Sequence, residues 1–164
     1  MGMERLFVGV GLVTLLGVSV SVEASDSTSI TLKQIGRYSA GVSTNPDEPR
    51  TEISAFDPTS KRLFSINLNL RQLDVLDLGA PETPVLVQSV PLGGKPNSVA
   101  VSRGVVAVAL EGAVKTDPGS VKLFSTTGML LNQLTVGALP DMVTFSPNGR
   151  WLLVANEGEP NSYN

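Results

Sequence analysis

The side chains that could do chemistry in this sequence are oxygen donors, and most of them stand at the ends of short apolar runs. The chain of 164 residues contains no histidine and no cysteine. Zinc sites built from those residues, disulfides, and catalysis by Ser-His-Asp or Cys-His groups within this chain are therefore excluded. Acid–base chemistry is left to Asp, Glu, Lys, Arg, Tyr and Ser, and a metal site would need oxygen ligands, which suit calcium or magnesium.

Five residues are the main candidates for a ligand or metal site. They share a position at or close to the end of an apolar run, and they are Glu111, Asp117, Asp141, Asn156 and Glu157. Comparable positions are held by Glu52, Asn67, Asn97 and Glu159. Calcium is the candidate cation, because its usual shell is built from carboxylate and carbonyl oxygens. The alternative is that these side chains cap turns and satisfy loop amides, and this role is favoured because loops are polar in general.

Three similar segments position these candidates. They span residues 52–67, 97–112 and 141–158, so their starting positions are 45 and 44 residues apart. Their β-branched and partly alternating apolar residues indicate strands, and Asn148-Gly149 predicts a hairpin turn. Asp117-Pro118-Gly119 is predicted to be another turn. Because an antiparallel hairpin brings the start of one strand beside the end of the next, the candidates are expected to gather on one rim.

The same repeat contains two further strands. Residues 73–78 and 120–125 predict a third strand, residues 84–94 and 130–137 predict a fourth, and residues 30–41 resemble a fourth strand standing alone. Four strands in about 45 residues is the size of one blade of a β-propeller. A β-sandwich is the alternative fold.

The predicted fold is therefore an all-β propeller with four-stranded antiparallel blades. The blades are expected at roughly 49–94, 95–138 and 139–164, with the last one partial. A closed propeller has typically about 4–8 blades. The two and a half blades predicted here are accordingly expected to be the N-terminal part of a larger, incomplete ring.

The first 24 residues have the features of a signal peptide. The uncharged apolar run of residues 6–22 follows Arg5, and Val22 and Ala24 supply the small residues expected before cleavage ahead of Ser25. An uncleaved anchor is the alternative. The mature chain, residues 25–164, is thus predicted to be secreted, periplasmic or at the cell surface, with no membrane contact beyond the signal peptide or a downstream anchor. The net charge of −3 gives no reason to expect nucleic acid as a partner.

The longer motifs resemble a known family. The hairpin PDMVTFSPNGRWLLVAN, residues 140–156, resembles the YVTN-type propeller repeat. The runs VALEGAVKTDPGSVKLFSTTG and VGALPDMVTFSPNGRWLLVANEGEPNSYN, residues 108–128 and 136–164, resemble the choice-of-anchor I domain family. The resemblance covers residues 30–164. It implies a seven-bladed propeller in exported bacterial proteins, several of which carry alternative surface-anchoring tails at their C-termini.

Two functions follow from these observations. The first is an exported binding or scaffold module that acts through the loops of one propeller face on a ligand or a surface protein. The second is implied by the resemblance alone, because some members of the family carry an alkaline phosphatase-like label: the chain would be part of a metal-dependent phosphoesterase. No catalytic residue and no cofactor beyond the candidate calcium is identified.

Overall fold

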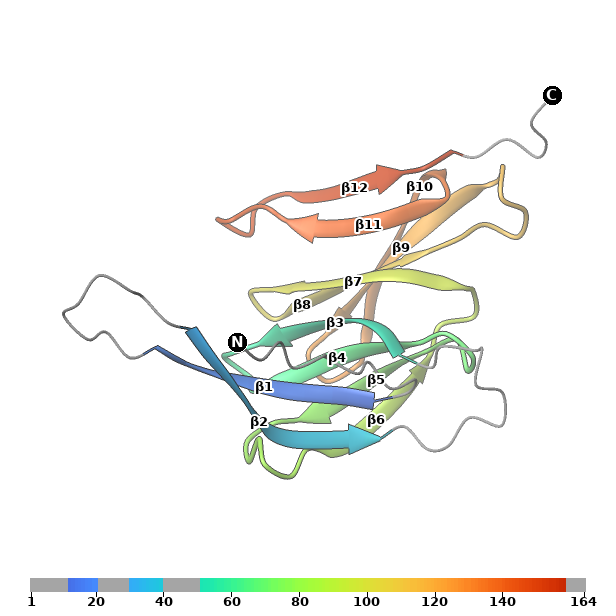
Figure 1. The fold of residues 1–164 in the computed structure, drawn as a ribbon. Coiled ribbons are helices and arrows are strands. Elements are labelled where there is room, and N and C mark those ends of the chain that lie inside the picture. The colour runs from blue at the N-terminus through green and yellow to red at the C-terminus, as the bar shows by residue number, and fades with distance from the viewer. Residues whose placement is uncertain (1–11, 21–29, 40–50, 159–164) are drawn as a thin grey trace, which may run out of the picture.

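A computed structural model describes residues 12–20, 30–39 and 51–158, and this part of the chain consists of strands joined by turns (Figure 1). The first four-stranded sheet contains β3 (Thr51–Asp57), β4 (Arg62–Asn67), β5 (Gln72–Asp77) and β6 (Val85–Pro91). The second contains β7 (Pro96–Ser102), β8 (Val105–Leu110), β9 (Pro118–Ser125) and β10 (Leu130–Ala138). Two-stranded sheets are formed by β1 (Leu12–Val20) with β2 (Ile30–Ser39) and by β11 (Pro140–Phe145) with β12 (Leu152–Asn156).

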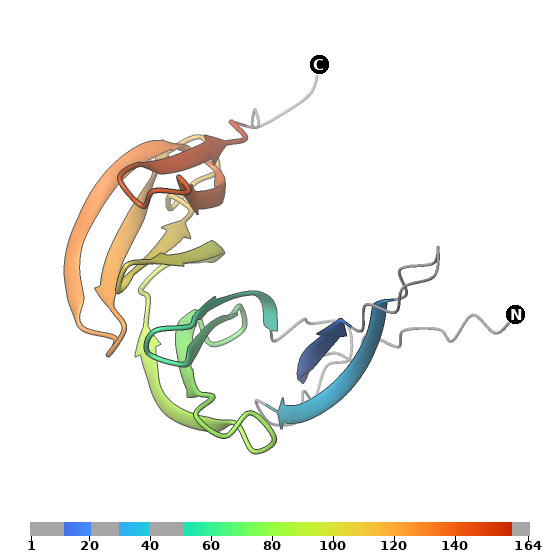
Figure 2. The ribbon, with the colours of Figure 1, turned by 90° about the vertical axis from the view of Figure 1, so that its left-hand side faces the viewer.

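The sheets stand side by side around an open centre, as the blades of a propeller do (Figure 2). Within each four-stranded sheet the strands pair in chain order and antiparallel, with β6 and β10 on the outer margin of the arc. These observations confirm the predicted all-β fold with four-stranded antiparallel blades. The described sheets form an arc that does not close. No described segment is a helix long and apolar enough to span a lipid bilayer.

The hydrophobic core lies between the sheets. On β8, Val106 and Val108 face the first sheet and pack in one cluster with Phe64 of β4. The alternate residues of β8, Ala107 and Ala109, face the third sheet and belong to a second cluster with residues of β9 and β11. Because β8 is covered on both faces, its sequence is a continuous apolar run rather than an alternating one. Each sheet therefore depends on its neighbour for its buried face.

The turn after residue 110 differs from the prediction. The chain turns over residues 114–117, where the Asp117 amide donates to the Val114 carbonyl at 2.9 Å. Pro118 and Gly119 already belong to β9, so the prediction of a turn at Asp117-Pro118-Gly119 was wrong in its position. A Cβ atom at Gly119 would lie 2.5 Å from Cδ of Pro140, so this glycine permits close packing between sheets rather than a turn.

The Asn148-Gly149 turn is confirmed. The Gly149 amide donates to the Ser146 carbonyl at 2.7 Å, and Gly149 has a φ of 65°, in the left-handed region that glycine adopts readily. Asn148 contributes in a different way, because its side-chain oxygen accepts from the Arg150 amide at 3.1 Å. This hairpin places β11 and β12 in register from Phe145 and Leu152 onward.

The start of the chain also differs from expectation. Residues 1–24 were expected to stand apart from the fold and residues 30–41 to form a lone strand. In the structure β1 pairs antiparallel with β2, with Leu12 opposite Ser39 at one end and Val20 opposite Ile30 at the other. An extended apolar segment rich in valine and leucine suits a strand, and β2 offers it an edge of unpaired backbone groups. The signal peptide itself stays a prediction, and its cleavage would remove β1.

Candidate functional site

Most of the predicted site residues meet at one end of the sheets. Glu111, Asp141 and Glu157 line a pocket of about 340 Å³, together with Glu52 and Asn97. The remaining lining residues are Leu68, Lys95, Lys115 and Leu139. We call the four carboxylates Glu52, Glu111, Asp141 and Glu157 the acidic rim. Its pocket lies at the small end of the range of about 300–1,000 Å³ that is usual for small-molecule sites.

The same backbone contact fixes the two glutamates that follow a second strand. The Glu111 amide donates to the carbonyl of Lys95 at 2.9 Å, and the Glu157 amide donates to the carbonyl of Leu139 at 2.8 Å. Lys95 and Leu139 are the residues immediately before the inner strands β7 and β11. Each glutamate is therefore held next to the residue that precedes its own hairpin. Equivalent positions of the sequence repeat thus place carboxylates at equivalent positions of the rim.

Leu139 closes the floor of this pocket in an unusual backbone conformation. Its φ is 48°, and its side chain is only 5% exposed. A left-handed conformation costs a branched residue about 1–2 kcal/mol, so surrounding contacts must hold it. The contact from Glu157 described above is one of them, and a second joins the Gly158 amide to the Ala138 carbonyl at 3.2 Å. The rim is thus held by the backbone as well as by side chains.

One ion pair partly neutralises the acidic rim. Nζ of Lys95 lies 2.7 Å from Oε1 of Glu111, and the lysine side chain is 56% exposed. The Glu111 side chain is only 15% exposed, but the lysine remains largely in water, so the pair stabilises by about 0–1 kcal/mol. Among the described residues, the carboxylates of Glu52, Asp141 and Glu157 have no such partner. Lys115 is the second basic residue of the lining, so the four carboxylates of the pocket outnumber its basic groups by two.

Asn97 joins two neighbouring sheets beside the pocket. Its side-chain amide donates to the carbonyl of Pro140 at 3.3 Å, across 43 residues of sequence. One residue further, the buried hydroxyl of Ser98 accepts from the amide of Val143 at 3.1 Å. These two bonds connect β7 with β11, so the carboxylates of successive blades are held at a fixed spacing.

Other predicted residues serve local structure. Asp117 accepts from the Val114 amide at 3.3 Å and caps its own turn. Asn67 is buried and its oxygen accepts from the Leu70 amide at 3.1 Å. The side chain of Asn156 packs against Gly137, where an added Cβ would lie 2.8 Å from Cγ of Asn156. None of the three lines the rim pocket, and Glu159 lies outside the described residues.

The acidic rim is not arranged as a metal centre. Over residues 12–20, 30–39 and 51–158, no group of three or more acidic side chains lies close enough to hold a metal ion. A calcium site needs such convergence, because its oxygen ligands must all lie within about 2.3–2.6 Å of the ion. The calcium hypothesis and the phosphoesterase that would use a metal gain no support from this geometry.

Sequence reasoning missed a buried polar cluster in the first sheet. The carboxylate of Asp74 is 4% exposed and accepts from Oγ of Ser89 at 2.6 Å and from Nε2 of Gln72 at 2.8 Å. Burial and the negative charge of Asp74 raise the pKa of the nearby Tyr38. Gln72 and Asp74 lie two positions apart on β5, and only the pairing of β5 with β6 brings Ser89 opposite Asp74.

Comparison with protein families gives one match. A model described as the choice-of-anchor I domain matches residues 52–164. This range includes all four carboxylates of the acidic rim. No curated protein matches the sequence significantly.

Comparison with solved structures shows the fold. Hydrazine synthase of Kuenenia stuttgartiensis is similar with a TM-score of 0.57 and 19% identity, over 79% of this chain and 37% of that one. A luciferin-regenerating enzyme is similar with a TM-score of 0.52 and 16% identity, over 83% of this chain and 44% of that one. The chain thus spans less than half of either protein. At these identities the likeness concerns the arrangement of strands and not the chemistry.

Proposed function

Because the chain belongs to the choice-of-anchor I domain family, we propose that it is part of an exported β-propeller module that binds a partner through the acidic rim. The observation that carries this proposal is the pocket of about 340 Å³, into which three successive sheets each deliver at least one carboxylate. A binding role needs a preformed, concave, polar site on a rigid scaffold, and the paired strands behind the rim supply that scaffold.

The chemistry of the rim favours a cationic group on the partner. Glu52, Asp141 and Glu157 have no ion pair among the described residues, and they line the pocket together with the apolar side chains of Leu68 and Leu139. An alkylammonium group fits both features, since its methylene stem packs on leucine while its charge meets the carboxylates. A lysine side chain at the surface of a partner protein is the simplest source of such a group.

Titration with trilysine, followed by amide chemical shifts in NMR spectra, tests this proposal. We expect shifts at Glu111, Asp141 and Glu157. The triple variant Glu52→Gln, Asp141→Asn, Glu157→Gln should lower the affinity about ten-fold, because each exposed charge pair contributes a few tenths of a kcal/mol to about 1 kcal/mol. A control variant, Asp77→Asn with Glu82→Gln, removes two carboxylates at the other end of the first sheet and should change little. Equal affinity of the triple variant and the unaltered chain would refute binding through the rim.

Export through a cleaved signal peptide is the second part of the proposal. It rests on the apolar run of residues 6–22 and on the small residues Val22 and Ala24. Expression of the chain in a bacterial host, followed by mass spectrometry of the exported fraction, should find a mature N-terminus at Ser25. A chain that keeps Met1 and stays in the membrane fraction would favour an uncleaved anchor instead.

A further inference from the structure

The hairpin turns at the ends of the sheets opposite the acidic rim are rich in basic residues, while Asp77 and Glu82 supply two carboxylates at the same end of the first sheet. Three hairpin turns join each inner strand to the next one, over residues 57–62, 102–105 and 146–151. We call the surface formed by these turns the hairpin face. Its charged residues are Asp57, Lys61, Arg62, Arg103 and Arg150, so four basic groups accompany a single acidic one.

The single carboxylate of the hairpin face is occupied within its own turn. Oδ2 of Asp57 accepts from the hydroxyl of Ser60 at 2.7 Å and from the Ser60 amide at 3.0 Å, and the residue is 5% exposed. Arg62 is also engaged, because its Nη1 donates to the carbonyl of Thr126 at 2.6 Å. The charges that remain accessible are those of Lys61, Arg103 and Arg150, which are exposed and form no ion pair with a described residue.

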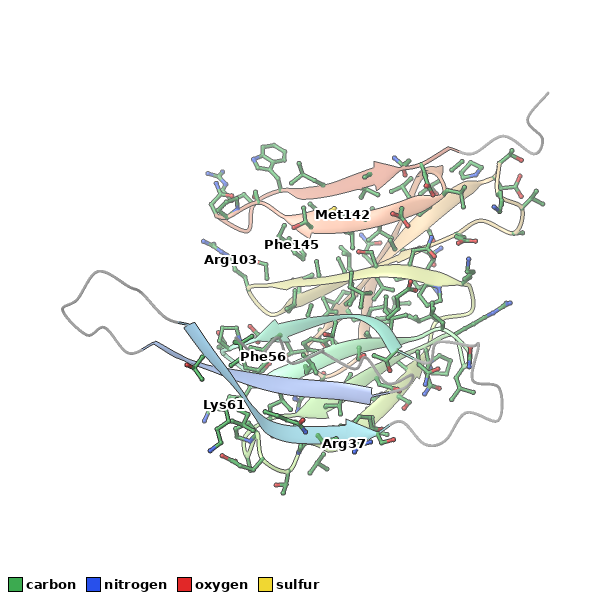
Figure 3. The ribbon with its side chains drawn as sticks, in the orientation of Figure 1. Arg37, Phe56, Lys61, Arg103, Met142 and Phe145 are labelled. Carbon is green, nitrogen blue, oxygen red and sulfur yellow. The ribbon has the colours of Figure 1, made fainter. Side chains whose placement is uncertain are left out.

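Two of these cations sit in backbone conformations that favour glycine. Lys61 has a φ of 54° and Arg103 a φ of 50°, both in the left-handed region (labelled in Figure 3). A side chain there costs about 1–2 kcal/mol relative to a right-handed conformation, and glycine avoids this cost. The stem of Arg103 also lies against the next turn, since a Cβ at Gly149 would be 2.8 Å from Cδ of Arg103. Glycine can therefore replace Lys61 and Arg103 without straining the backbone.

Exposed aromatic rings accompany the charges. Trp151 follows Arg150 and is 71% exposed, and Phe56 precedes the first turn and is 47% exposed. The face of an aromatic ring is electron-rich and attracts the slightly positive C–H groups of a sugar ring. The hairpin face and its border therefore present both cations and aromatic rings.

We propose that the hairpin face is a docking surface for an extended anionic polysaccharide. The three accessible cations come from the hairpin turns of three successive sheets of the arc, so a chain with repeated acidic groups can contact all of them. The charges hold the acidic groups, and the aromatic rings hold the sugar rings between them. The choice of a polysaccharide rests on the export that the proposed function includes.

Binding of alginate oligosaccharides to the full chain tests the proposal. Trp151 is the only tryptophan of the sequence and lies on the hairpin face, so its fluorescence reports binding there. The double variant Lys61→Gly with Arg103→Gly should weaken alginate binding at least five-fold and reduce its salt dependence. Its thermal stability should be equal or higher, because glycine suits both backbone positions. A loss of binding will therefore not come from loss of the fold.

Arg71→Gly is the matched control. Arg71 is also basic and left-handed, with a φ of 49°, but it lies at the acidic-rim end, where it lines a pocket with Lys95 and Glu111. This variant should bind alginate as the unaltered chain does. Unchanged binding by the double variant, or an equal loss in Arg71→Gly, would overturn the proposal.

Other polymers decide the class of ligand. Neutral dextran should leave the fluorescence unchanged, and polyglutamate should bind more weakly than alginate. Single-stranded DNA or polyglutamate that binds more tightly than alginate would replace the polysaccharide by that class. The triple variant of the acidic rim should bind alginate as tightly or more tightly, because it removes negative charge. The experiments can therefore refute binding through the acidic rim without refuting docking on the hairpin face, and the reverse.

Discussion

At the scale of single residues, the carboxyl group of Asp57 makes the stability of the folded chain depend on pH. Its burial alone would raise the pKa, but the hydrogen bonds from Ser60 and from the Thr59 amide outweigh burial, and the pKa of Asp57 is lowered. A carboxyl whose pKa is lower in the folded chain stabilises that chain above the unfolded pKa of about 3.9. This contribution is lost as the pH falls through the folded pKa.

We therefore expect Asp57→Asn to destabilise the chain at neutral pH. The loss should be about 1 kcal/mol, because a hydrogen bond to a charged acceptor is stronger than one to a neutral acceptor by that order. Urea unfolding between pH 7 and pH 2.5 should show the two proteins converging in acid. Glu82→Gln, which removes an exposed carboxyl, is the control and should show no such convergence. A constant gap between Asp57→Asn and the unaltered chain at every pH would contradict the linkage.

Replacing either of the two buried serines, Ser98 and Ser65, by alanine is expected to change the stability in opposite directions. Ser98→Ala leaves the buried amide of Val143 without its acceptor and should cost about 1–3 kcal/mol. Ser65 is also buried, but its Oγ has no hydrogen-bond partner in the described part of the chain. Ser65→Ala removes that unsatisfied hydroxyl and should be neutral or stabilising by about 1 kcal/mol. If the denaturant midpoints of both variants moved in the same direction, the effect of the substitution would depend on burial alone and not on whether the hydroxyl has a hydrogen-bond partner.

At the scale of elements, the strands were predictable and their contacts were not. Strands were predicted at residues 120–125 and 130–137, which lie in β9 and β10, and at residues 73–78, which match β5 except for residue 78. Local pattern suffices there, because apolar alternation and turn residues act within a few positions. The hydroxyl of Ser98 and the floor at Leu139 depend on the distance between two sheets, which no local pattern encodes.

The candidate site was predictable in part for the same reason. Glu111 and Glu157 follow equivalent strands, so the repeat alone placed both at one rim. Lys95 was missed because it precedes the repeated segment 97–112, although the same hairpin pairing brings it beside Glu111. Asp117 was predicted to join them, but its turn folds back on Val114.

Gly119 marks the closest approach between the second and third sheets. Gly119→Ala would place a Cβ 2.5 Å from Cδ of Pro140 and 2.6 Å from the carbonyl of Leu110, neither of which can yield easily. We expect a loss of about 1–3 kcal/mol in urea unfolding, as for other overpacked sites. Gly94→Ala is the matched control, because its nearest neighbours would be 3.8 Å away. Equal stability of Gly119→Ala and Gly94→Ala would mean that the second and third sheets can move apart at no cost in free energy of unfolding.

At the scale of the whole molecule, the last described sheet has one covered face and one open face. Val143, Phe145, Leu152 and Val154 pack on the second sheet. The alternate residues Met142 and Leu153 are more than half exposed, at 54% and 53%. An apolar sheet surface of this kind favours association in water.

Self-association of the isolated chain is the expected result. Analytical ultracentrifugation should find oligomers at micromolar concentration, and Leu153→Lys should shift them toward monomer with little change in unfolding free energy. Leu152→Lys, one position away, places the charge against the second sheet and should destabilise strongly instead. A monodisperse monomer of the unaltered chain that melts cooperatively would contradict the prediction of an incomplete ring.

The core between the sheets has a consequence for how such a chain can change length. Phe64 and Val108 meet across one repeat of the sequence, and Ala109 meets Val143 across the next. An unequal crossing-over that copies or deletes one whole repeat places a sheet against another sheet of the same kind. The interface between the two new neighbours is then of the type already present in the chain. A change of half a repeat pairs an inner strand with an outer one and leaves a buried face uncovered. The gene is therefore expected to grow and shrink in steps of a whole blade.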